Sequence, residues 1–309
     1  MDRLRAIKYF VEVSDKRSFT RAARSLGVPA ASVSRRIQEL EADLGVELIH
    51  RTTRVVNLTE LGNLYLEQIR PSLAGLDYAD ELVNQDPDHI AGRLRITAIP
   101  DYGRHCLMPA LANFRRLYPK IVLDIELTDQ ISNLANNDVD LAIRSTSALP
   151  DRAVARRLST NQFIMVASIK YLERCGHPAS LAELERHQAI IFRRPEGLLY
   201  WQADTADGWK ELANPQAYIS NQGEELVNEA LAGTGIALLP EWGVSEHLES
   251  GSLTRVAIED VRVSISRNPN SGIYLLYHRP KYGLKKVQIA AEFLISVLSD
   301  DRSNDLRSE

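Results

Sequence analysis

The sequence predicts an α/β protein with three parts: an N-terminal winged helix-turn-helix, a long linker helix, and a two-lobed α/β domain. Three observations support this prediction. Apolar residues recur at helical spacing in the first 58 residues, a second helical stripe starts at Thr59, and strands alternate with helices from about residue 92 onward. With 309 residues, 44% of them hydrophobic, the chain can form two or three domains with buried cores.

Two helices are expected before residue 27. The first, over about 3–14, carries an apolar side formed by Leu4, Ile7, Phe10 and Val11. Ser18 can cap a second helix that runs to Leu26, and Gly27 ends it. Ala22 and Ala23 give this second helix a small surface that another helix can cross closely. Together with the next helix, this pattern is typical of a helix-turn-helix.

The next helix, over about 29–44, has two contrasting sides. Its apolar stripe faces a core and consists of Val33, Ile37, Leu40 and Leu44. The opposite side carries Ala31, Arg35, Gln38 and Ala42, flanked by Ser32 and Glu39. Small side chains allow a close approach to a duplex, and hydroxyl and guanidinium groups can reach base edges and phosphates. We therefore expect this outer side to enter a DNA groove.

A basic hairpin is expected after the third helix. Short strands over 46–49 and 55–58 would enclose His50, Arg51, Thr52, Thr53 and Arg54. Such a wing suits contact with phosphates or the minor groove, which positions a protein without reading sequence. Residues 1–58 contain eleven Arg and Lys against seven Asp and Glu, a net charge of +4, whereas the whole chain carries -4. The remainder is therefore at -8, and only the N-terminal part has the charge that a polyanion requires.

Three segments carry a family resemblance: SFTxAAxxL at 18–26, VSRxIxxLExxLGVxL at 33–48, and RxxRxVxLTxxG at 51–62. They resemble the winged helix-turn-helix of LysR-type transcriptional regulators, over nearly all of the first sixty residues. The family often has Ser-Gln-Pro-Ala where this chain has Pro29 to Ser32, so the base-reading Gln is missing at Ala30. The better candidates are Ser32, Ser34 and Arg35. The complete set of expected DNA-binding residues is Ser18, Ala30, Ala31, Ser32, Ser34, Arg35, Arg36, Arg51, Thr52, Thr53 and Arg54.

The linker helix is expected to begin at Thr59 and to continue for about 28 residues. Its stripe has coiled-coil spacing and consists of Leu61, Tyr65, Ile69, Leu73, Leu76, Ala79 and Leu82 or Val83. A lone helix cannot bury such a stripe, which predicts a partner helix from a second copy, and the resemblance implies the same dimerisation. Pro71 should bend the helix. Residues 86–89 would end it and form a hinge.

The third part is predicted to have two lobes. Strands over 94–99, 121–127 and 141–144, with helices to about 117 and near 131–136, indicate a mostly parallel sheet. Further strands are expected over 157–167, 189–192, 199–202, 209–212, 217–220, 235–240 and 272–277, with helices over 181–187, from 222, and over 283–298. The segment 138–144 also resembles the family's effector-binding region, whose shape is like a periplasmic binding protein. The expected domains are 1–58, 59–89 and 90–299, with lobes over about 90–160 plus 268–299 and 161–267, followed by a disordered tail, 300–309.

Ligands of open α/β sheets bind at the carboxyl ends of strands. The candidate effector-binding residues at such ends are Ile99, Pro100, Asp101, Arg144, Ser145, Thr146, Phe192, Asn221 and Gly223. We favour Asp101 as a helix cap over a ligand contact. If it faces the ligand, a purely anionic effector is disfavoured, although Arg144 could hold a carboxylate or equally pair with a neighbouring acid.

Other features limit the possible functions. No apolar segment is long enough for a signal peptide or a membrane span, so we expect a cytoplasmic protein, with Cys106 and Cys175 as packing residues. Nucleophile elbow, Walker and dinucleotide motifs are missing, the seven His residues lack metal-ligand spacing, and no cofactor or metal is expected.

These observations and the resemblance predict a sequence-specific regulator of transcription and not an enzyme. It would bind double-stranded promoter DNA and a small organic effector. It would form a homodimer that assembles further to a tetramer, and it would contact RNA polymerase but no membrane. Two alternatives stay open: a DNA-packaging protein without an effector, and an enzyme with a DNA-binding appendage.

Overall fold

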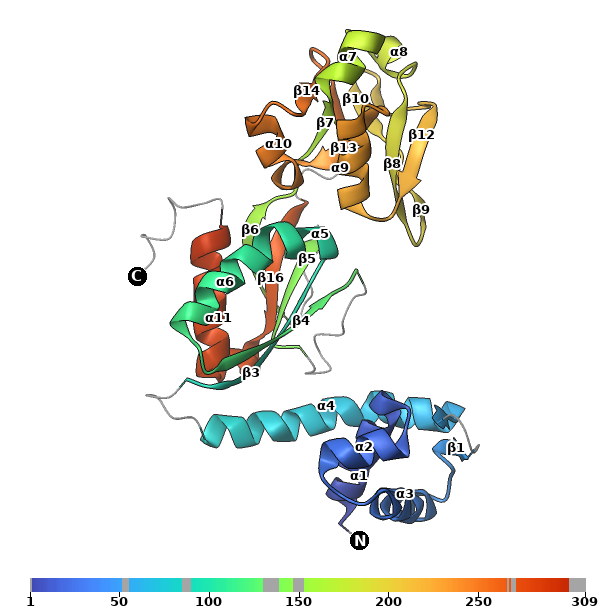
Figure 1. The fold of residues 1–309 in the computed structure, drawn as a ribbon, viewed down its shortest axis with the longest axis vertical. Coiled ribbons are helices and arrows are strands. Elements are labelled where there is room, and N and C mark those ends of the chain that lie inside the picture. Colours follow the sequence, from blue (N-terminus) through green and yellow to red (C-terminus); the bar gives the residue numbers. More distant parts are fainter. Residues whose placement is uncertain are drawn as a thin grey trace. The chain divides into compact units, whose positions relative to one another are not determined.

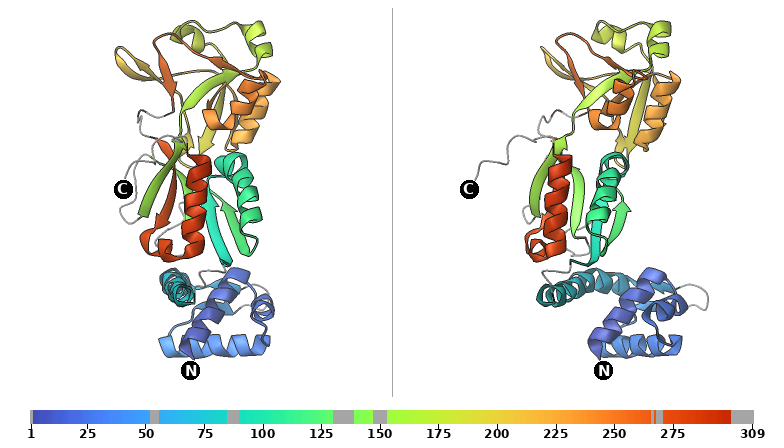
Figure 2. Two further views of the ribbon diagram at one scale, coloured as in Figure 1. Left: turned by 90° about the vertical axis from the view of Figure 1, so that its left-hand side faces the viewer. Right: turned by 60° about the vertical axis from the view of Figure 1, so that its left-hand side comes forward.

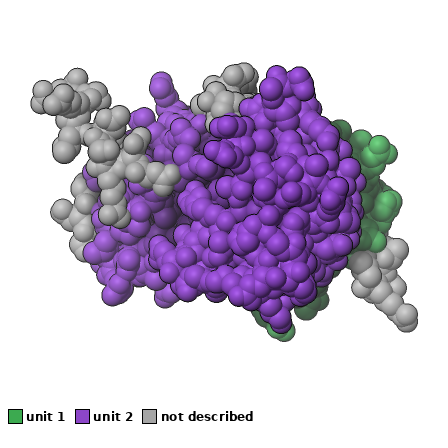
Figure 3. Space-filling view, turned by 90° about the horizontal axis from the view of Figure 1, so that it is seen from above, with its two compact units in different colours: residues 1–89, 132–140 green, residues 90–131, 141–309 purple. Residues whose placement is uncertain are grey.

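The computed structural model describes residues 2–51, 56–84, 90–129, 139–146, 153–265, 267 and 271–299. The chain forms two compact units (Figures 1 and 3). The first unit comprises residues 1–89 and 132–140, and the second comprises residues 90–131 and 141–309. Among the described helices, none combines the length and the apolar character that a membrane span needs.

The first unit contains four helices and a short hairpin within its described residues. They are α1 (Arg3–Lys16), α2 (Phe19–Leu26), α3 (Ala30–Leu44), β1 (Ile49–Arg51), β2 (Val56–Leu58) and α4 (Glu60–Val83). Side chains cap three of the helices, since Asp2, Ser18 and Thr59 each accept a hydrogen bond from the first turn. Gly27 and Gly45 end α2 and α3 at φ values of 66° and 70°, a conformation that favours glycine.

One core holds this unit together. Its fully buried members include Phe10, Val13, Ile37, Leu40 and Leu48. The linker helix α4 adds partly buried side chains to the same core: Tyr65, Leu66, Ile69 and Leu73. Part of the stripe that was expected to need a second copy is therefore packed on the chain's own first unit. The expected apolar side of α1 includes Leu4, but this side chain is 44% exposed.

The second unit begins with a lobe built on a five-stranded sheet of order β4-β3-β5-β16-β6. Its strands are β3 (Gly92–Ala98), β4 (Ile121–Leu127), β5 (Leu141–Thr146), β6 (Ala153–Thr160) and β16 (Gly272–His278). β3 is parallel to β4 and β5, but β16 is antiparallel to β5 and β6. The expectation of a mostly parallel sheet is thus only half right, because β6 leaves for the other lobe and β16 returns from it.

The helical layer of this first lobe covers one face of the sheet (Figure 2). A continuous helical stretch consists of α5 (Pro100–Tyr102), a π-helical segment (Gly103–Leu107) and α6 (Met108–Leu117), and α11 (Lys285–Leu298) lies beside it. The rings of Phe114 on α6 and Phe293 on α11 are 5.3 Å apart. Leu94 and Ile96 of β3 are buried beneath these helices.

The second lobe repeats this strand pattern. Its main sheet has the order β12-β8-β13-β7-β14, formed by β7 (Phe163–Ala167), β8 (Ala189–Arg194), β12 (Gln216–Ser220), β13 (Ile236–Pro240) and β14 (Thr254–Val256). Again one half is parallel and the other antiparallel. Alternate residues of β13 face two different cores, with Leu238 on one side and Leu239 on the other.

Smaller elements complete the second lobe. They are β9 (Gly197–Leu198), β10 (Gln202–Thr205), β11 (Gly208–Glu211), β15 (Arg262–Ser264), α7 (Ile169–Cys175), α8 (Leu181–Leu184), α9 (Gly223–Ala232), η3 (Glu241–Gly243) and α10 (Ser245–Glu249). In the first lobe, one further short helix, η4 (Arg279–Gly283), follows β16. The expected strand over 157–167 is in fact two, β6 and β7, which belong to different sheets. The hairpin expected over 199–212 is formed by β10 and β11. The expected hinge at 86–89, the expected helix at 131–136 and the tail lie outside the described residues.

Candidate functional site

Helix α3 separates a buried side from an outer side. Val33, Ile37 and Leu40 are at most 1% exposed, so they fix the helix on the core. The outer side presents the side chains that the sequence placed there, Ala31, Arg35, Gln38 and Ala42, all of them exposed. A helix held in this way offers one rigid, polar face to a partner.

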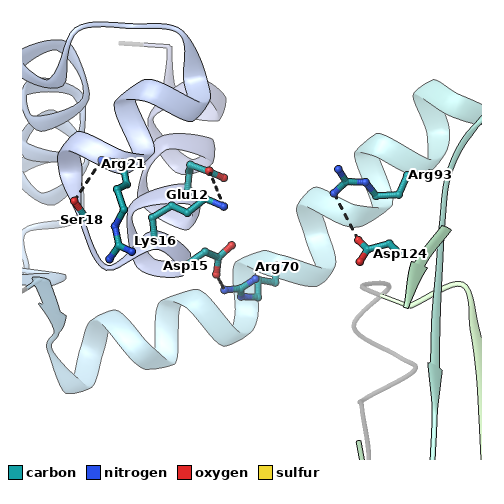
Figure 4. Close-up of polar contacts among 8 residues, drawn as sticks. All are labelled: Glu12, Asp15, Lys16, Ser18, Arg21, Arg70, Arg93 and Asp124. Carbon is teal, nitrogen blue, oxygen red and sulfur yellow. Dashed lines mark hydrogen bonds and ion pairs between the residues drawn. The ribbon is translucent and has the colours of Figure 1, made fainter. Parts of the chain in front are cut away.

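Arg35 stands out on this face. Its side chain is 72% exposed, and its Nε lies 3.6 Å from Glu39 Oε1, one turn further along. An exposed ion pair of this kind contributes little stability, so Arg35 can leave it at small cost. Ala30 is exposed, whereas Ser32, Ser34 and Arg36 are half-buried. Ser18 lies at the start of α2, where its Oγ accepts a hydrogen bond from Arg21 N at 3.3 Å (Figure 4).

Glu41 is a functional candidate that the sequence reasoning missed. Its side chain is only 7% exposed, and its Oε1 accepts hydrogen bonds from Leu48 N at 2.9 Å and Ile49 N at 3.1 Å. One carboxylate on α3 thus fixes the chain that leads into β1. A signal was present, because Glu41 stands four residues after Ile37 and hence on the buried side of the helix.

The hairpin differs from the expected one. The first strand was expected over 46–49, but β1 begins at Ile49 and includes His50 and Arg51, which were expected in the loop. Glu41 binds the backbone amides of residues 48 and 49, and the ladder begins at the second of these, where Ile49 pairs with Leu58. The expected tip residues Thr52, Thr53 and Arg54 lie outside the described residues, and so does the Arg51 side chain.

Helix α4 is joined to α1 by charges as well as by the core. Arg70 pairs with Asp15 (Figure 4), and Lys8 Nζ lies 3.0 Å from Asp77 Oδ1. On the other flank of α4, Leu61 and Leu64 are 50% and 56% exposed. The helix therefore moves with the first unit, and it leaves apolar side chains uncovered.

Asp101 contacts the second lobe. The residue in the capping position before α5 is Ile99, so Asp101 does not cap its own helix as we favoured. Instead its Oδ2 accepts a hydrogen bond from Gly223 N at 3.2 Å, at the start of α9. Its Oδ1 lies 3.3 Å from Arg104 Nη1. Burial raises the pKa of Asp101, and Arg104 and the Gly223 N–H oppose this shift.

Arg144 lies within β5 and is half-buried. Its Nη2 donates to Thr97 Oγ1 at 2.8 Å, and its Nη1 donates to Ile143 O at 2.9 Å. Burial lowers the pKa of Arg144, while the charges of Asp129 and Glu126 oppose the shift. These two hydrogen bonds stay within the first lobe, and the guanidinium lies in the field of two acids.

A second group of contacts joins the lobes near their crossover. Asn161, between β6 and β7, donates to Ser145 Oγ at 2.8 Å and accepts from Trp242 Nε1 at 3.1 Å. The Trp242 ring meets the Tyr102 ring edge-on, with 5.2 Å between centroids. Ser145 and Thr146 were expected after the strand, but they belong to β5.

The other expected effector residues are dispersed. Phe192 packs against the core beside α9, Ile99, Pro100 and Thr146 are half-buried, and Asn221 is exposed. Among the expected effector residues, a hydrogen bond therefore joins Asp101 to Gly223, and Ser145 bonds to Asn161, which was not in the expected set. In the described part of the chain, no cluster of three or more His, Cys, Asp or Glu could hold a metal ion.

Two family models match the chain. Residues 4–63 match the bacterial regulatory helix-turn-helix protein of the lysR family, and residues 87–299 match the LysR substrate binding domain. Among curated proteins, the HTH-type transcriptional activator TtdR of Escherichia coli (strain UTI89 / UPEC) is 33% identical over 291 residues, which cover 93% of this chain and 91% of TtdR. The HTH-type transcriptional regulator DmlR of Escherichia coli (strain K12) is 32% identical over 305 residues, 97% of this chain and 96% of DmlR.

Solved structures show the same architecture over the whole chain. The full-length virulence activator AphB of Vibrio cholerae is 26% identical, with a TM-score of 0.63, over 96% of this chain and 99% of AphB. The regulator CrgA of Neisseria meningitidis is 28% identical, with a TM-score of 0.61, over 96% of this chain and 99% of CrgA. The similarity therefore includes both units.

Proposed function

The chain belongs to the LysR family of transcriptional regulators, and we propose that it regulates promoters as a homodimer whose α3 helices read base edges. It has the family's helix-turn-helix and effector-binding domains. One observation carries the proposal: Val33, Ile37 and Leu40 of the apolar stripe are fully buried, while Arg35 stands exposed on the opposite face of α3. A guanidinium in this position can bind a guanine edge through two hydrogen bonds.

We call α1 to α4 and the hairpin of the first unit the head. The roles of the other DNA-binding candidates in the head follow from their positions. Ser32 and Ser34 lie in the first turns of α3, where the helix dipole favours phosphate. Arg51 and Arg54 belong to the hairpin, and we assign them phosphate contacts that position the head without reading sequence. Ser18 at the start of α2, together with Ala30, Ala31, Arg36, Thr52 and Thr53, completes the proposed interface.

DNA binding of four variants tests these roles. We expect Arg35→Ala to reduce the preference for operator over random duplex, by about 1–3 kcal/mol. Arg51→Ala and Arg54→Ala should weaken binding to both duplexes and lower the salt slope by about 1 each. Arg93→Ala, which removes an exposed guanidinium from the effector-binding domain, is the control. Fluorescence anisotropy with a duplex from genome-wide mapping measures all four, and equal losses on both duplexes for Arg35→Ala would exclude base reading.

The dimer is proposed to form along α4. Leu61, Leu64 and Leu76 are all at least 50% exposed on this helix, and such leucines are stabilised when a second helix covers them. Leu64→Glu should convert the dimer to a monomer in sedimentation velocity. Asn63→Glu adds the same charge to the adjacent exposed position, on another side of α4, and should leave the dimer intact. A dimer that survives Leu64→Glu with unchanged affinity places the interface elsewhere.

The effector-binding domain is proposed to take a small organic molecule between its lobes, where Asp101, Arg144 and Ser145 lie. Such a ligand biases the arrangement of the heads only as far as it binds one arrangement more tightly. A thermal-shift screen of metabolites identifies it, because a ligand that binds only the native state raises Tm. We further propose RNA polymerase as a partner, a tetramer as the higher assembly, a cytoplasmic site of action, and no enzymatic activity.

A further inference from the structure

Helix α5 is the point at which the first lobe contacts the second. It follows β3 directly, and its two consecutive residues Asp101 and Tyr102 contact α9 and Trp242 of the second lobe. The helix is held firmly on its own lobe. Tyr102 is 2% exposed, and a side chain at Gly103 would overlap Leu127 at the end of β4. Asp101 therefore stands on a rigid support.

The Asp101 carboxylate caps a helix of the other lobe. Gly223 is the first residue of α9, and its N–H has no acceptor within the helix. The preceding residue, Gln222, makes no side-chain capping bond. Asp101 Oδ2 fills this role across the lobes at 3.2 Å, and Arg104 holds the same carboxylate from its own lobe. A carboxylate at this end of a helix is also favoured by the helix dipole.

Asp101 approaches Gly223 so closely that a Cβ there would displace the carboxylate. Its φ is not among the positive values of the described glycines, so backbone conformation does not demand glycine here. A Cβ on Gly223 would overlap Asp101 Oδ2 and approach its Cγ to 2.9 Å. In the first turn of a helix, alanine is otherwise favoured over glycine. The two residues are thus fitted to each other across 122 positions of sequence.

We propose that Asp101 is a positioning residue, a latch that sets the arrangement of the two lobes when no effector is bound. The Asn161 contacts with Ser145 and Trp242 form a hinge beside the latch, at the strands that cross between lobes. An effector would act by keeping or by breaking the contact between Asp101 and Gly223. This inference therefore rests on the effector response proposed above. Because Asp101 and Gly223 are both within the proposed effector site, an effector that enters there meets the latch directly.

A double-mutant cycle in the full-length protein tests the latch. Asp101→Ala removes the acceptor, and Gly223→Ala pushes the carboxylate away without removing it. Hydrogen exchange read by mass spectrometry reports the amides at the start of α9. We expect each single variant to exchange about 10–100 times faster there, the range for loss of one hydrogen bond to a charged group. In the Asp101→Ala background, Gly223→Ala should not accelerate exchange further, because the carboxylate that its Cβ would displace is absent.

Control variants separate this result from general damage. Asp124→Ala removes an exposed acid of β4 that pairs with Arg93, and should leave exchange in α9 unchanged (Figure 4). Asp101→Asn keeps the size of the side chain and should accelerate exchange less than Asp101→Ala. If Asp101→Ala prevents folding, Asp101→Asn tests the latch in its place. The latch is refuted if Asp101 variants exchange like Asp124→Ala, or if Gly223→Ala acts equally with and without Asp101. Duplex binding of the wild-type protein is measured separately, so failure of the proposed function is distinguished from failure of the latch.

Discussion

Replacement of Glu41 by alanine should unfold the head at a much lower temperature. The side chain is buried on α3, and it accepts hydrogen bonds from the buried amides of Leu48 and Ile49. Alanine removes the acceptor of both bonds and leaves a space that water reaches poorly. The two amides then stay unpaired in the core beside the hairpin.

The size of the effect follows from these two bonds. A hydrogen bond to a charged group contributes about 1.5–3 kcal/mol, so two of them predict a loss of about 3–5 kcal/mol, given that neighbouring bonds are not fully additive. For a domain of this size, each kcal/mol lowers Tm by about 4–8 °C. We therefore expect Tm of the head to fall by at least about 12 °C. Glu39→Ala, two residues away on the exposed side, should change stability by less than about 0.5 kcal/mol.

Two spectroscopic signals separate the units in this assay. All three tryptophans, Trp201, Trp209 and Trp242, belong to the second unit, whereas helical circular dichroism at 222 nm includes the head. Glu41→Ala should shift an early transition in circular dichroism and leave the transition in tryptophan fluorescence unchanged. The reasoning is refuted if Glu41→Ala and Glu39→Ala shift the dichroism transition equally.

Three further changes have definite expected outcomes. Gly62→Ala would place a Cβ on the carbonyl oxygen of Leu48 and should destabilise the head by about 1–3 kcal/mol. In the same helix, the Cβ of Gly75→Ala would meet no atom within 4 Å, so this change should stabilise the head by about 1 kcal/mol. Thermal melts followed by circular dichroism measure both changes. Burial lowers the pKa of His187 from 6.5, so below this pH the unfolded chain takes up a proton that the native chain refuses. The free energy of unfolding from urea titration, followed by tryptophan fluorescence, should therefore fall as pH drops below about 6.5. His187→Gln should reduce that fall, and an unchanged fall in this variant would contradict the assignment to His187.

Much of the head was predictable because its signals are local. The periodic apolar stripe of α3, the cap at Ser18 and the glycine at 27 each act within a few residues, and each is found in the structure. The expected bounds of the first hairpin strand were wrong, because β1 runs from Ile49 to Arg51 and the residues before it are held by a buried side chain, Glu41, which binds the amides of residues 48 and 49. Such a contact is a tertiary effect, and local strand propensity carries no trace of it.

The effector domain was less predictable for the same reason. Strand β14 and helix α10 are short and weakly patterned, and β14 takes its structure from β7, with which it pairs at the edge of the sheet. The mixed direction of both sheets depends on which strand crosses between lobes, which no local pattern encodes. Asp101 was expected to cap its own helix, where a cap is normally sought, but it contacts the start of α9 instead.

The contact between Asp101 and Gly223 shows why an interlobe contact is harder to predict than the exposed face of one helix. A helix presents its side chains on faces that follow from its period, so helical periodicity alone places Arg35 on the outer side of α3. A site between lobes is formed by residues that meet only after two sheets have folded, and here the carboxylate and the amide are 122 residues apart. The close approach is visible in the structure, because a Cβ on Gly223 would overlap the Asp101 carboxylate although the φ of this glycine is not positive. Periodicity carries no signal for a contact of this kind, because each partner lies in a different element of a different lobe.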